Sequence, residues 1–430
     1  MTRLSPRYAL VPLLAILAAC GADGPTGLKI NATTSTVMQG GSGIALTATG
    51  GRKGDKVSWR LLPGSSGSLT PSDDTRSAIY FPDASAGAAS THSIEAKLRS
   101  DTQTLALQVQ PSPVSELMAS LPQWWQTVSL PGTGGTGYTG EPRGFAPDGA
   151  GGYYVSYASP TSKVIQVKGS AAPVEIGALA GYGIIGGTKD GTLYLVQAAA
   201  NYALTVSKRT PDGKLSVLTR TAAHDGKKAT IDGPSGTATA LLARFTFDSA
   251  GNLFALDGSK VRKIAADGSW STLAGDGCGM GTAPACPLYP VAGKGASARI
   301  GQSTAIASAT DGTLYVATAS AILKITKDGD VTILAGANNE RSGRMIDGAG
   351  TDAYFHQPLS LSLDTAGNIY ALDYDTIRRI TPSGAVSTVA TGIGAMQQGH
   401  GELAATSIRM NDNGAIDFLR YVDIRRVKVQ

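Results

Sequence analysis

With 430 residues the chain has room for two or three domains. Its 55 glycines, 6% aromatic residues and 16% charged residues are typical of a β protein rich in turns, and they argue against a helical or a disordered chain. The formal charge of +5 falls to +3 if Arg3 and Arg7 leave with a leader (35 basic minus 32 acidic residues). This weak balance, without a long basic run, predicts no nucleic-acid partner.

Residues 1–19 predict a secretory leader, in which two arginines precede an apolar stretch too short to span a bilayer. The leader ends in Leu17-Ala-Ala-Cys20, which resembles the lipobox of bacterial lipoproteins. The resemblance implies that Cys20 is lipidated and becomes the mature N-terminus, with a polar tether over residues 20–27. Gly21 implies, by similarity to enteric lipoproteins, transport to the outer membrane, and the periplasmic or surface face is left open. The alternative is an ordinary signal peptide with an unmodified cysteine.

Residues 28–110 alternate apolar and polar side chains with a period of two, broken by glycines and prolines into roughly seven short strands. One of them, Val57-Ser-Trp-Arg-Leu61, places Trp59 on an apolar face. This segment resembles a bacterial immunoglobulin-like β-sandwich, without the cysteine pair of antibody domains. We expect a spacer that holds the next domain away from the membrane. Residues 111–118, which begin Pro-Ser-Pro, are the predicted linker.

One pattern recurs through the remaining segment, residues 119–430. A glycine opens a short apolar strand, a second strand with Lys or Arg near its end follows, and a glycine turn leads to a third strand. The opening glycines are Gly151, Gly191, Gly251, Gly312, Gly367 and Gly414. Their steps of 40, 60, 61, 55 and 47 residues leave room for four strands each, as a β-propeller blade requires.

A second motif lies between the units, at Asp232-Gly-Pro-Ser-Gly, Gly293-Lys-Gly-Ala-Ser and Asp347-Gly-Ala-Gly-Thr. Together the two motifs resemble NHL repeats, and the resemblance implies a six-bladed NHL-type β-propeller. The sixth copy lacks its outer strand. Trp125-Gln-Thr-Val-Ser-Leu-Pro-Gly132 is similar to the outer strand of another copy, so we expect it to complete the sixth blade and close the ring.

Cys278 and Cys286 are the two cysteines beyond Cys20. In an oxidising compartment so close a pair predicts a disulfide that staples a loop. A disulfide that closes so small a loop stabilises the folded state by roughly 2–3 kcal/mol in the chain-entropy model. A metal site lacks nearby histidines or further cysteines, and a redox site lacks the C-x-x-C spacing.

Three histidines fall in the predicted connections between blades: His224, His356 and His400. Some NHL-like propellers are zinc-dependent amidating lyases that use three histidines around the central axis. The three histidines of this chain occupy different registers of the repeat, so we expect solvated loop histidines, with His356 and His400 as candidate contacts at the channel face or in loops.

Carboxylates are the second candidate for ligands of a metal ion. Related six-bladed lactonases and esterases hold a divalent ion with Glu, Asn and Asp on the axis. Asp373 and Asp375 follow an apolar strand and can face the channel. Aspartates also precede the repeat glycines, and their recurrence indicates ordinary turn residues: Asp190, Asp248, Asp311 and Asp364.

Basic residues recur in the strand that follows the opening apolar strand of each unit, which is the third of the four strands in a blade. We expect them on its solvated side: Lys263, Lys324, Arg378, Arg379, Arg425 and Arg426. The NHL domains of some eukaryotic proteins bind RNA through such residues, whereas an exported chain rarely meets RNA.

No second hydrophobic stretch of spanning length follows the leader, so we expect a lipid-anchored protein of the bacterial cell envelope. The leading function is non-catalytic binding of a protein, peptide or glycan through propeller loops, chiefly those after Leu273 and Leu334, without a cofactor. The alternative is a hydrolase or lyase that uses zinc or calcium at the channel mouth, because propellers host both functions.

Overall fold

A computed structural model describes residues 27–84, 88–121, 126–129, 136–139, 141–158, 163–224, 230–240, 244–248, 251–277, 289–301, 303–336, 345–394, 405–420 and 423–429. Within these ranges the regular elements are all β-strands, apart from three short 3-10 helices: η1 (Gly177–Leu179), η2 (Gly295–Ser297) and η3 (Gly350–Asp352). The predicted all-β class is confirmed. A search of the same ranges finds no helix of the length and apolar character that a membrane span requires.

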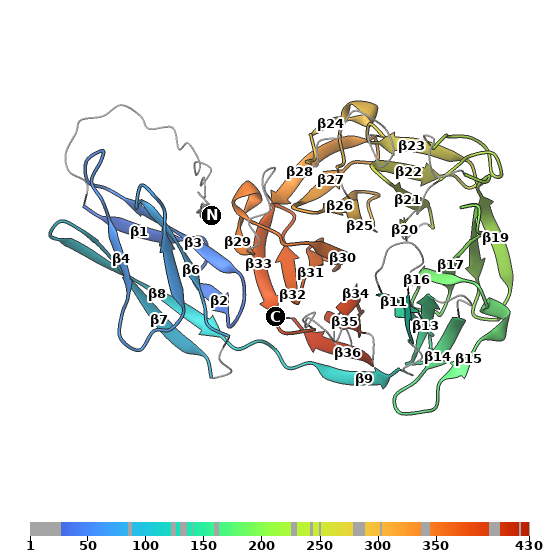
Figure 1. Cartoon of the computed structure of the whole chain (residues 1–430), viewed down its shortest axis with the longest axis horizontal. Helices are drawn as coiled ribbons and strands as arrows, with labels where there is room; N and C mark the ends of the chain where they lie inside the picture. The colour runs from blue at the N-terminus through green and yellow to red at the C-terminus, as the bar shows by residue number, and fades with distance from the viewer. Residues whose placement is uncertain are drawn as a thin grey trace.

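The N-terminal sandwich consists of two four-stranded sheets, ordered β1-β3-β6-β5 and β2-β8-β7-β4 (Figure 1). Its strands are β1 (Lys29–Ala32), β2 (Thr36–Met38), β3 (Gly43–Thr49), β4 (Ser58–Leu61), β5 (Ser68–Pro71), β6 (Ser77–Phe81), β7 (Ser90–Leu98) and β8 (Asp101–Gln110). Alternate residues point inward, so Ile44 and Tyr80 of one sheet meet Ile94 and Leu107 of the other in one apolar cluster. Trp59 packs at the edge of this cluster and donates its indole N–H to the carbonyl of residue 75, at 2.9 Å.

The described strands of the C-terminal domain form six blades around a central axis (Figure 1). Blade 1 contains β12 (Glu141–Pro147), β13 (Tyr153–Ala158), β14 (Lys163–Val167) and β15 (Val174–Glu175). Blade 2 contains β16 (Gly183–Gly187), β17 (Leu193–Ala198), β18 (Leu204–Arg209) and β19 (Leu215–Arg220). Blade 3 contains β20 (Arg244–Phe247), β21 (Leu253–Asp257), β22 (Lys260–Ile264) and β23 (Trp270–Ala274).

The other three blades repeat this order, and two of them carry an extra short strand on the outer edge. Blade 4 contains β25 (Ser303–Ser308), β26 (Leu314–Thr318), β27 (Ala321–Ile325), β28 (Asp330–Gly336) and the edge strand β24 (Gly293–Lys294). Blade 5 contains β30 (Pro358–Leu363), β31 (Ile369–Asp373), β32 (Thr376–Ile380), β33 (Ala385–Ala390) and the edge strand β29 (Ile346–Ala349). Blade 6 contains β34 (Ala405–Met410), β35 (Ala415–Arg420), β36 (Asp423–Lys428) and β9 (Glu116–Ser120).

The turn between the first two strands explains why the repeat glycine persists. All six opening glycines have a positive φ, between 72° and 87°, which a side chain opposes. The preceding aspartates accept backbone N–H groups within the turn, as Asp248 does from Asn252 at 2.8 Å and Asp364 does from Asn368 at 2.8 Å. The prediction that these aspartates are turn residues is therefore confirmed, and they are not axial ligands.

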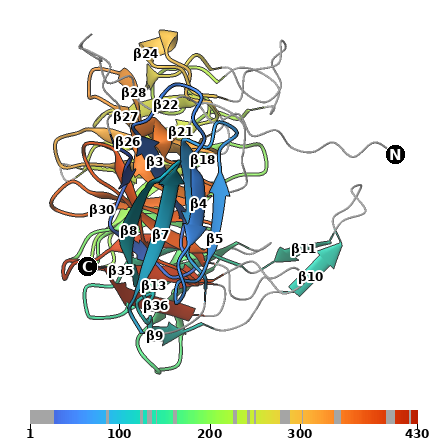
Figure 2. The same cartoon turned by 90° about the vertical axis from the view of Figure 1, so that its left-hand side faces the viewer.

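The sixth blade is completed from the N-terminal side, but not by the segment that the sequence pattern indicated. β9 pairs antiparallel with β36, with Ala119 opposite Ile424. The prediction that Trp125–Gly132 closes the ring is wrong, because β10 (Gln126–Ser129) instead forms a hairpin with β11 (Thr136–Thr139). Figure 2 shows that hairpin projecting away from the blades.

Burial gives the physical reason for this choice. Ala119 and Leu121 are 1% and 6% exposed, and they pack in one cluster with Ile424 of blade 6 and Ile165 of blade 1. The guanidinium of Arg425 also donates to the carbonyl oxygen of Ser115 at 2.9 Å. The strand that closes the ring thus begins inside the stretch predicted as a linker.

The sandwich and blade 5 share one continuous sheet. β29 pairs antiparallel with β33 and parallel with β3, where Ile346 lies opposite Gly43. The Thr388 hydroxyl donates to the Ser42 hydroxyl at 2.9 Å, and the Ser42 N–H approaches the Thr388 hydroxyl oxygen at 3.3 Å. The sandwich is therefore docked on the propeller edge through backbone and side-chain hydrogen bonds, and it is more than a spacer.

Candidate ligand site in the central channel

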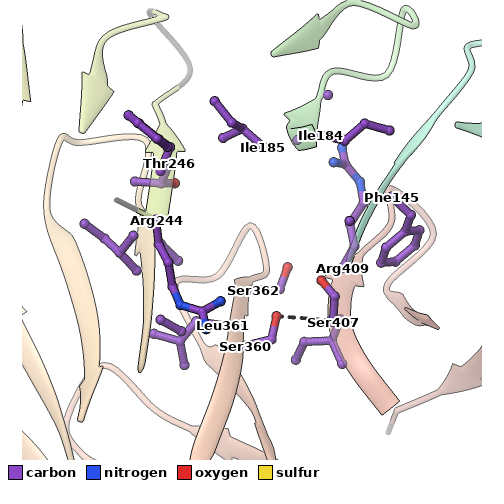
Figure 3. Close-up of a pocket in the computed structure, with 18 of the residues that line it drawn as sticks. Phe145, Ile184, Ile185, Arg244, Thr246, Ser360, Leu361, Ser362, Ser407 and Arg409 are labelled. Carbon is purple, nitrogen blue, oxygen red and sulfur yellow. Dashed lines mark hydrogen bonds between the residues drawn. The ribbon is translucent and has the colours of Figure 1, made fainter. Parts of the chain in front are cut away.

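The innermost strands of the six blades enclose a cavity of about 600 Å³ (Figure 3). These strands are β12, β16, β20, β25, β30 and β34, and each contacts the inner strands of both neighbouring blades. All six contribute residues to the cavity wall. Because every blade alternates its strand direction, the six inner strands run the same way along the axis. The closed ring thus presents equivalent positions of the repeat at similar depths.

Hydroxyl side chains join neighbouring inner strands. An inner strand is the edge of its blade, so its outward N–H and C=O groups need partners. Ser360 accepts the N–H of Ile408 at 3.1 Å, and Ser362 accepts the N–H of Met410 at 2.7 Å. Ser308 donates to the carbonyl oxygen of Phe247 at 2.7 Å. These contacts hold the channel wall together and make it polar at several depths.

Arginines supply the charge of the wall. Arg244 and Arg409 extend into the cavity from blades 3 and 6, which lie on opposite sides of a six-bladed ring (Figure 3). Arg143 of blade 1 also lines the cavity. Among the described lining residues the one carboxylate is Asp412, and its Oδ2 lies 3.2 Å from the ammonium group of Lys189.

The pKa values of two arginines report how the channel surrounds them. Burial lowers the pKa of Arg244 below its usual value, and the charge of Arg143 lowers it further. Burial also lowers the pKa of Arg409, and Asp412 and Asp417 partly offset that effect. Both groups remain cationic at neutral pH, because arginine starts far above it. The cavity is thus a basic environment that repels cations.

Asp373 does not face the channel, so that expectation is corrected. Its side chain is fully buried, and its carboxylate pairs with the fully buried guanidinium of Arg378 at 3.1 Å. It also accepts the backbone N–H groups of His356 and Gln357, at 3.0 and 2.7 Å. Asp373 is absent from the cavity wall. Its contacts are those of a structural residue that joins the entry of blade 5 to its second strand.

The prediction that Arg378 lies on the solvated side of its strand is wrong, because its side chain lies inside the blade. It pairs with Asp347 at 2.9 Å as well as with Asp373, and it donates to the carbonyl oxygen of Ile346. Blade 3 repeats this arrangement, because Arg262 is fully buried and lies 2.8 Å from both Asp257 and Asp232. The inter-blade Asp-Gly motif therefore supplies a carboxylate to a buried arginine of the next blade.

His356 and Asp375 lie near each other at one end of blade 5, outside the cavity wall. The His356 ring meets the edge of Tyr374 at 5.1 Å between ring centres, and Tyr374 has a φ of 60°. Burial raises the pKa of the Asp375 carboxyl, and the neighbouring charge of Asp373 raises it further. These residues form a small surface feature that is separate from the channel lining.

Four predicted residues lie outside the part of the chain that the structure describes: Cys20, Cys278, Cys286 and His400. Most of the loops after Leu273 and Leu334 also lie outside it. The lipid anchor, the disulfide and the loop contacts therefore stay predictions.

The described residues do not fit the metal sites that the family resemblance implies. Across the described ranges, no three His, Cys, Asp or Glu side chains gather closely enough to hold an ion. The wall carries arginines and hydroxyls where an axial Glu, Asn and Asp set or three histidines would stand. A cationic wall disfavours a divalent cation, so we derive no metal-dependent step.

Sequence reasoning missed the arginines because it followed the regular positions of the repeat. Strand register makes Arg409 equivalent to Thr246 and Ser362, since each stands one residue before the last of its inner strand. Arg244 is likewise equivalent to Ser360 and Ser407. The sequence did carry a signal for both residues, namely an arginine at a repeat position where other blades carry small residues.

No protein-family model matches the chain, and no curated protein matches it. Similar solved structures include a protein of unknown function from Bacteroides thetaiotaomicron, 13% identical, covering 95% of this chain and 99% of that one, with a TM-score of 0.47. A gluconolactonase from Xanthomonas campestris is 10% identical, covers 75% and 99%, and has a TM-score of 0.39. A streptogramin B lyase is 13% identical, covers 71% and 98%, and has a TM-score of 0.40. At these TM-scores we base no argument about ligand or reaction on the likenesses.

Proposed function

We propose that this chain is a non-catalytic binding lipoprotein of the bacterial cell envelope, with an NHL-type propeller that takes its ligand in the central channel. The observation that supports the proposal most is the cavity of about 600 Å³, lined by all six inner strands. Small-molecule sites in proteins span roughly 300–1,000 Å³. The ligand is a small molecule, or the end of a peptide or glycan chain, that enters between the blades.

Preorganisation supports binding in the channel. Ser360 and Ser362 are already held by hydrogen bonds to the next inner strand. A closed ring leaves the wall little freedom to lose when a ligand enters, so less of the contact energy is lost to ordering. The channel replaces the rim loops as the leading site, because all six inner strands converge on one cavity there.

The alternative of a metal-dependent hydrolase or lyase has weaker support. Such a site needs several carboxylate or histidine ligands near the axis. Among the described wall residues the carboxylate is Asp412, which is paired with Lys189. Arginines and serines can bind and orient a ligand, but this wall lacks a described general base for hydrolysis.

Anchoring through Cys20 places the binding domain at a membrane surface. Two or three acyl chains hold a protein firmly to a bilayer, whereas one does not. Gly21 favours the outer membrane by its similarity to sorted lipoproteins. Replacing Cys20 by Ser should move the protein from the membrane fraction to the soluble fraction, and persistence in the membrane fraction contradicts the anchor.

Channel binding is tested by filling the cavity. We expect equilibrium dialysis against labelled monosaccharides, short glycans and short peptides to identify at least one ligand that wild-type protein retains. Ser407→Trp places an indole in the channel and should abolish retention, because Ser407 lines the cavity. Ser216→Trp, on the exposed outer strand of blade 2, is the control and should bind normally. Retention by Ser407→Trp contradicts channel binding, and turnover of the ligand by wild type contradicts a non-catalytic role.

A further inference from the structure

The two fully buried arginines of blades 3 and 5, Arg262 and Arg378, are neutralised by neighbouring carboxylates. Arg262 and Arg378 each lie within 3.1 Å of an aspartate, and both also donate to backbone carbonyl oxygens. Arg426 donates to Asp417 at 2.6 Å. This is the expected behaviour, since a partly dehydrated guanidinium is costly without an anionic partner.

The channel arginines depart from that rule. Within the described part of the chain, neither Arg244 nor Arg409 makes an ion pair or a side-chain hydrogen bond. Arg409 lies opposite Asp417 in the strand register, but the Asp417 carboxylate is bound to Arg426 and to the hydroxyl of Tyr153. Arg244 and Arg409 are therefore two cationic groups whose donors point into a cavity and are left for another molecule.

The arrangement also works against the stability of the ligand-free protein. Arg244 carries the like charge of Arg143 within its electrostatic reach, although the two come from blades 1 and 3. Repulsion at Arg244 and loss of water around the Arg409 guanidinium both disfavour the empty channel. Proteins tolerate such a local cost where it serves a site. An anion in the cavity removes both penalties.

We infer that the channel binds a small organic anion, whose carboxylate or phosphate group is held by Arg244 or by Arg409. This inference rests on the proposed channel binding and names its ligand class. Guanidinium groups form charge-assisted, often bidentate bonds to both kinds of oxyanion. Ser360 and Ser407 add hydroxyls beside the arginines, and Ile184 adds an apolar wall (Figure 3). A wall of this mixed character suits an organic anion better than a bare inorganic ion.

Isothermal titration calorimetry tests the ligand class with probes of similar size. Glucuronate carries a carboxylate, glucose 6-phosphate carries a phosphate, and glucose is the neutral control. We expect one of the two anions to bind wild-type protein with at least tenfold higher affinity than glucose, and to bind more weakly as salt increases. The anion that binds identifies the acidic group. Failure of both anions to bind at millimolar concentration, or equal binding of glucose, overturns the inference.

Three variants assign binding to the arginines. Arg244→Gln or Arg409→Gln should weaken anion binding by about tenfold or more, the loss of one charge-assisted hydrogen bond, and the variant that does so identifies the arginine that holds the acidic group. Arg220→Gln makes the same charge change on the exposed outer strand of blade 2, and it should match wild type. Equal affinities in all three variants overturn the inference.

Two further readouts distinguish failure of the anion inference from failure of the proposed channel binding. The thermal midpoint of Arg244→Gln should equal or exceed that of wild type, because the substitution removes a repulsion; a clear loss of stability assigns Arg244 a structural role and contradicts the inference. If Ser407→Trp abolishes glucose binding while the arginine variants bind the anions normally, channel binding stands and the anion inference fails.

Discussion

Asp373 offers the sharpest test of how blade 5 is held together. Its carboxylate and the Arg378 guanidinium are both fully buried and lie 3.1 Å apart. Removing one partner of a buried ion pair typically costs about 3–5 kcal/mol. Asp347 stays 2.9 Å from Arg378 in Asp373→Ala, so the lower end of that range applies. We therefore expect a loss of about 3 kcal/mol in the free energy of unfolding.

Urea denaturation, monitored by tryptophan fluorescence and by far-ultraviolet circular dichroism, measures this loss. Coincidence of the two curves checks that a single free energy is meaningful for a chain with two domains. Asp375→Ala is the matched control two residues away, and it should be neutral or stabilising because burial raises the pKa of that carboxyl. A loss below about 1 kcal/mol for Asp373→Ala, the size of an ordinary hydrogen bond, would refute the reasoning.

Three other predictions concern pH, domain docking and ring closure. Because the folded-state pKa of Asp375 lies above its ordinary value of 3.8, its destabilising effect appears as pH rises through the folded pKa. Asp375→Asn should therefore raise the thermal midpoint at pH 7 but not below pH 3.8, and an equal gain at both pH values contradicts this sign. Thr388→Val removes the 2.9 Å bond to Ser42 and should speed limited proteolysis between sandwich and propeller; an unchanged rate argues against docking through this contact. Ala119→Asp puts a charge at a 1% exposed position of β9 and should cost several kcal/mol, whereas Leu117→Asp at a 56% exposed position of the same strand should cost little. Equally small costs for the two substitutions would contradict ring closure by β9.

The blade count could be predicted because its signal is local. Each opening glycine adopts a positive φ that other residues resist, so the turn keeps its glycine in every copy. Period-two alternation likewise reveals the sandwich strands, since one face of each sheet is buried. These features depend on a few neighbouring residues and survive without knowledge of the tertiary structure.

Ring closure could not be predicted with the same security. β9 is five residues long and lacks the glycine turn of other outer strands, whereas Gln126–Ser129 looks more like them. The pairing is decided by burial of Ala119 against Ile424, more than 300 residues later. No local pattern encodes a contact at that separation.

The candidate site shows the same limit. Arg378 looks like a solvated strand residue until Asp347 is found beside it, 31 residues earlier in the chain. Arg244 and Arg409 look like ordinary surface charges until six inner strands place them around one cavity. Their chemistry arises from the ring, and it could be suspected only as a departure from the small residues at equivalent positions.

A crystal structure of the protein soaked with glucuronate or glucose 6-phosphate, whichever binds more tightly, tests the central claim most directly. The account predicts that the acidic group lies within hydrogen-bonding distance of the guanidinium group of Arg244 or of Arg409, inside the channel. Density for the probe on the propeller rim, with the channel free of it, would contradict the account.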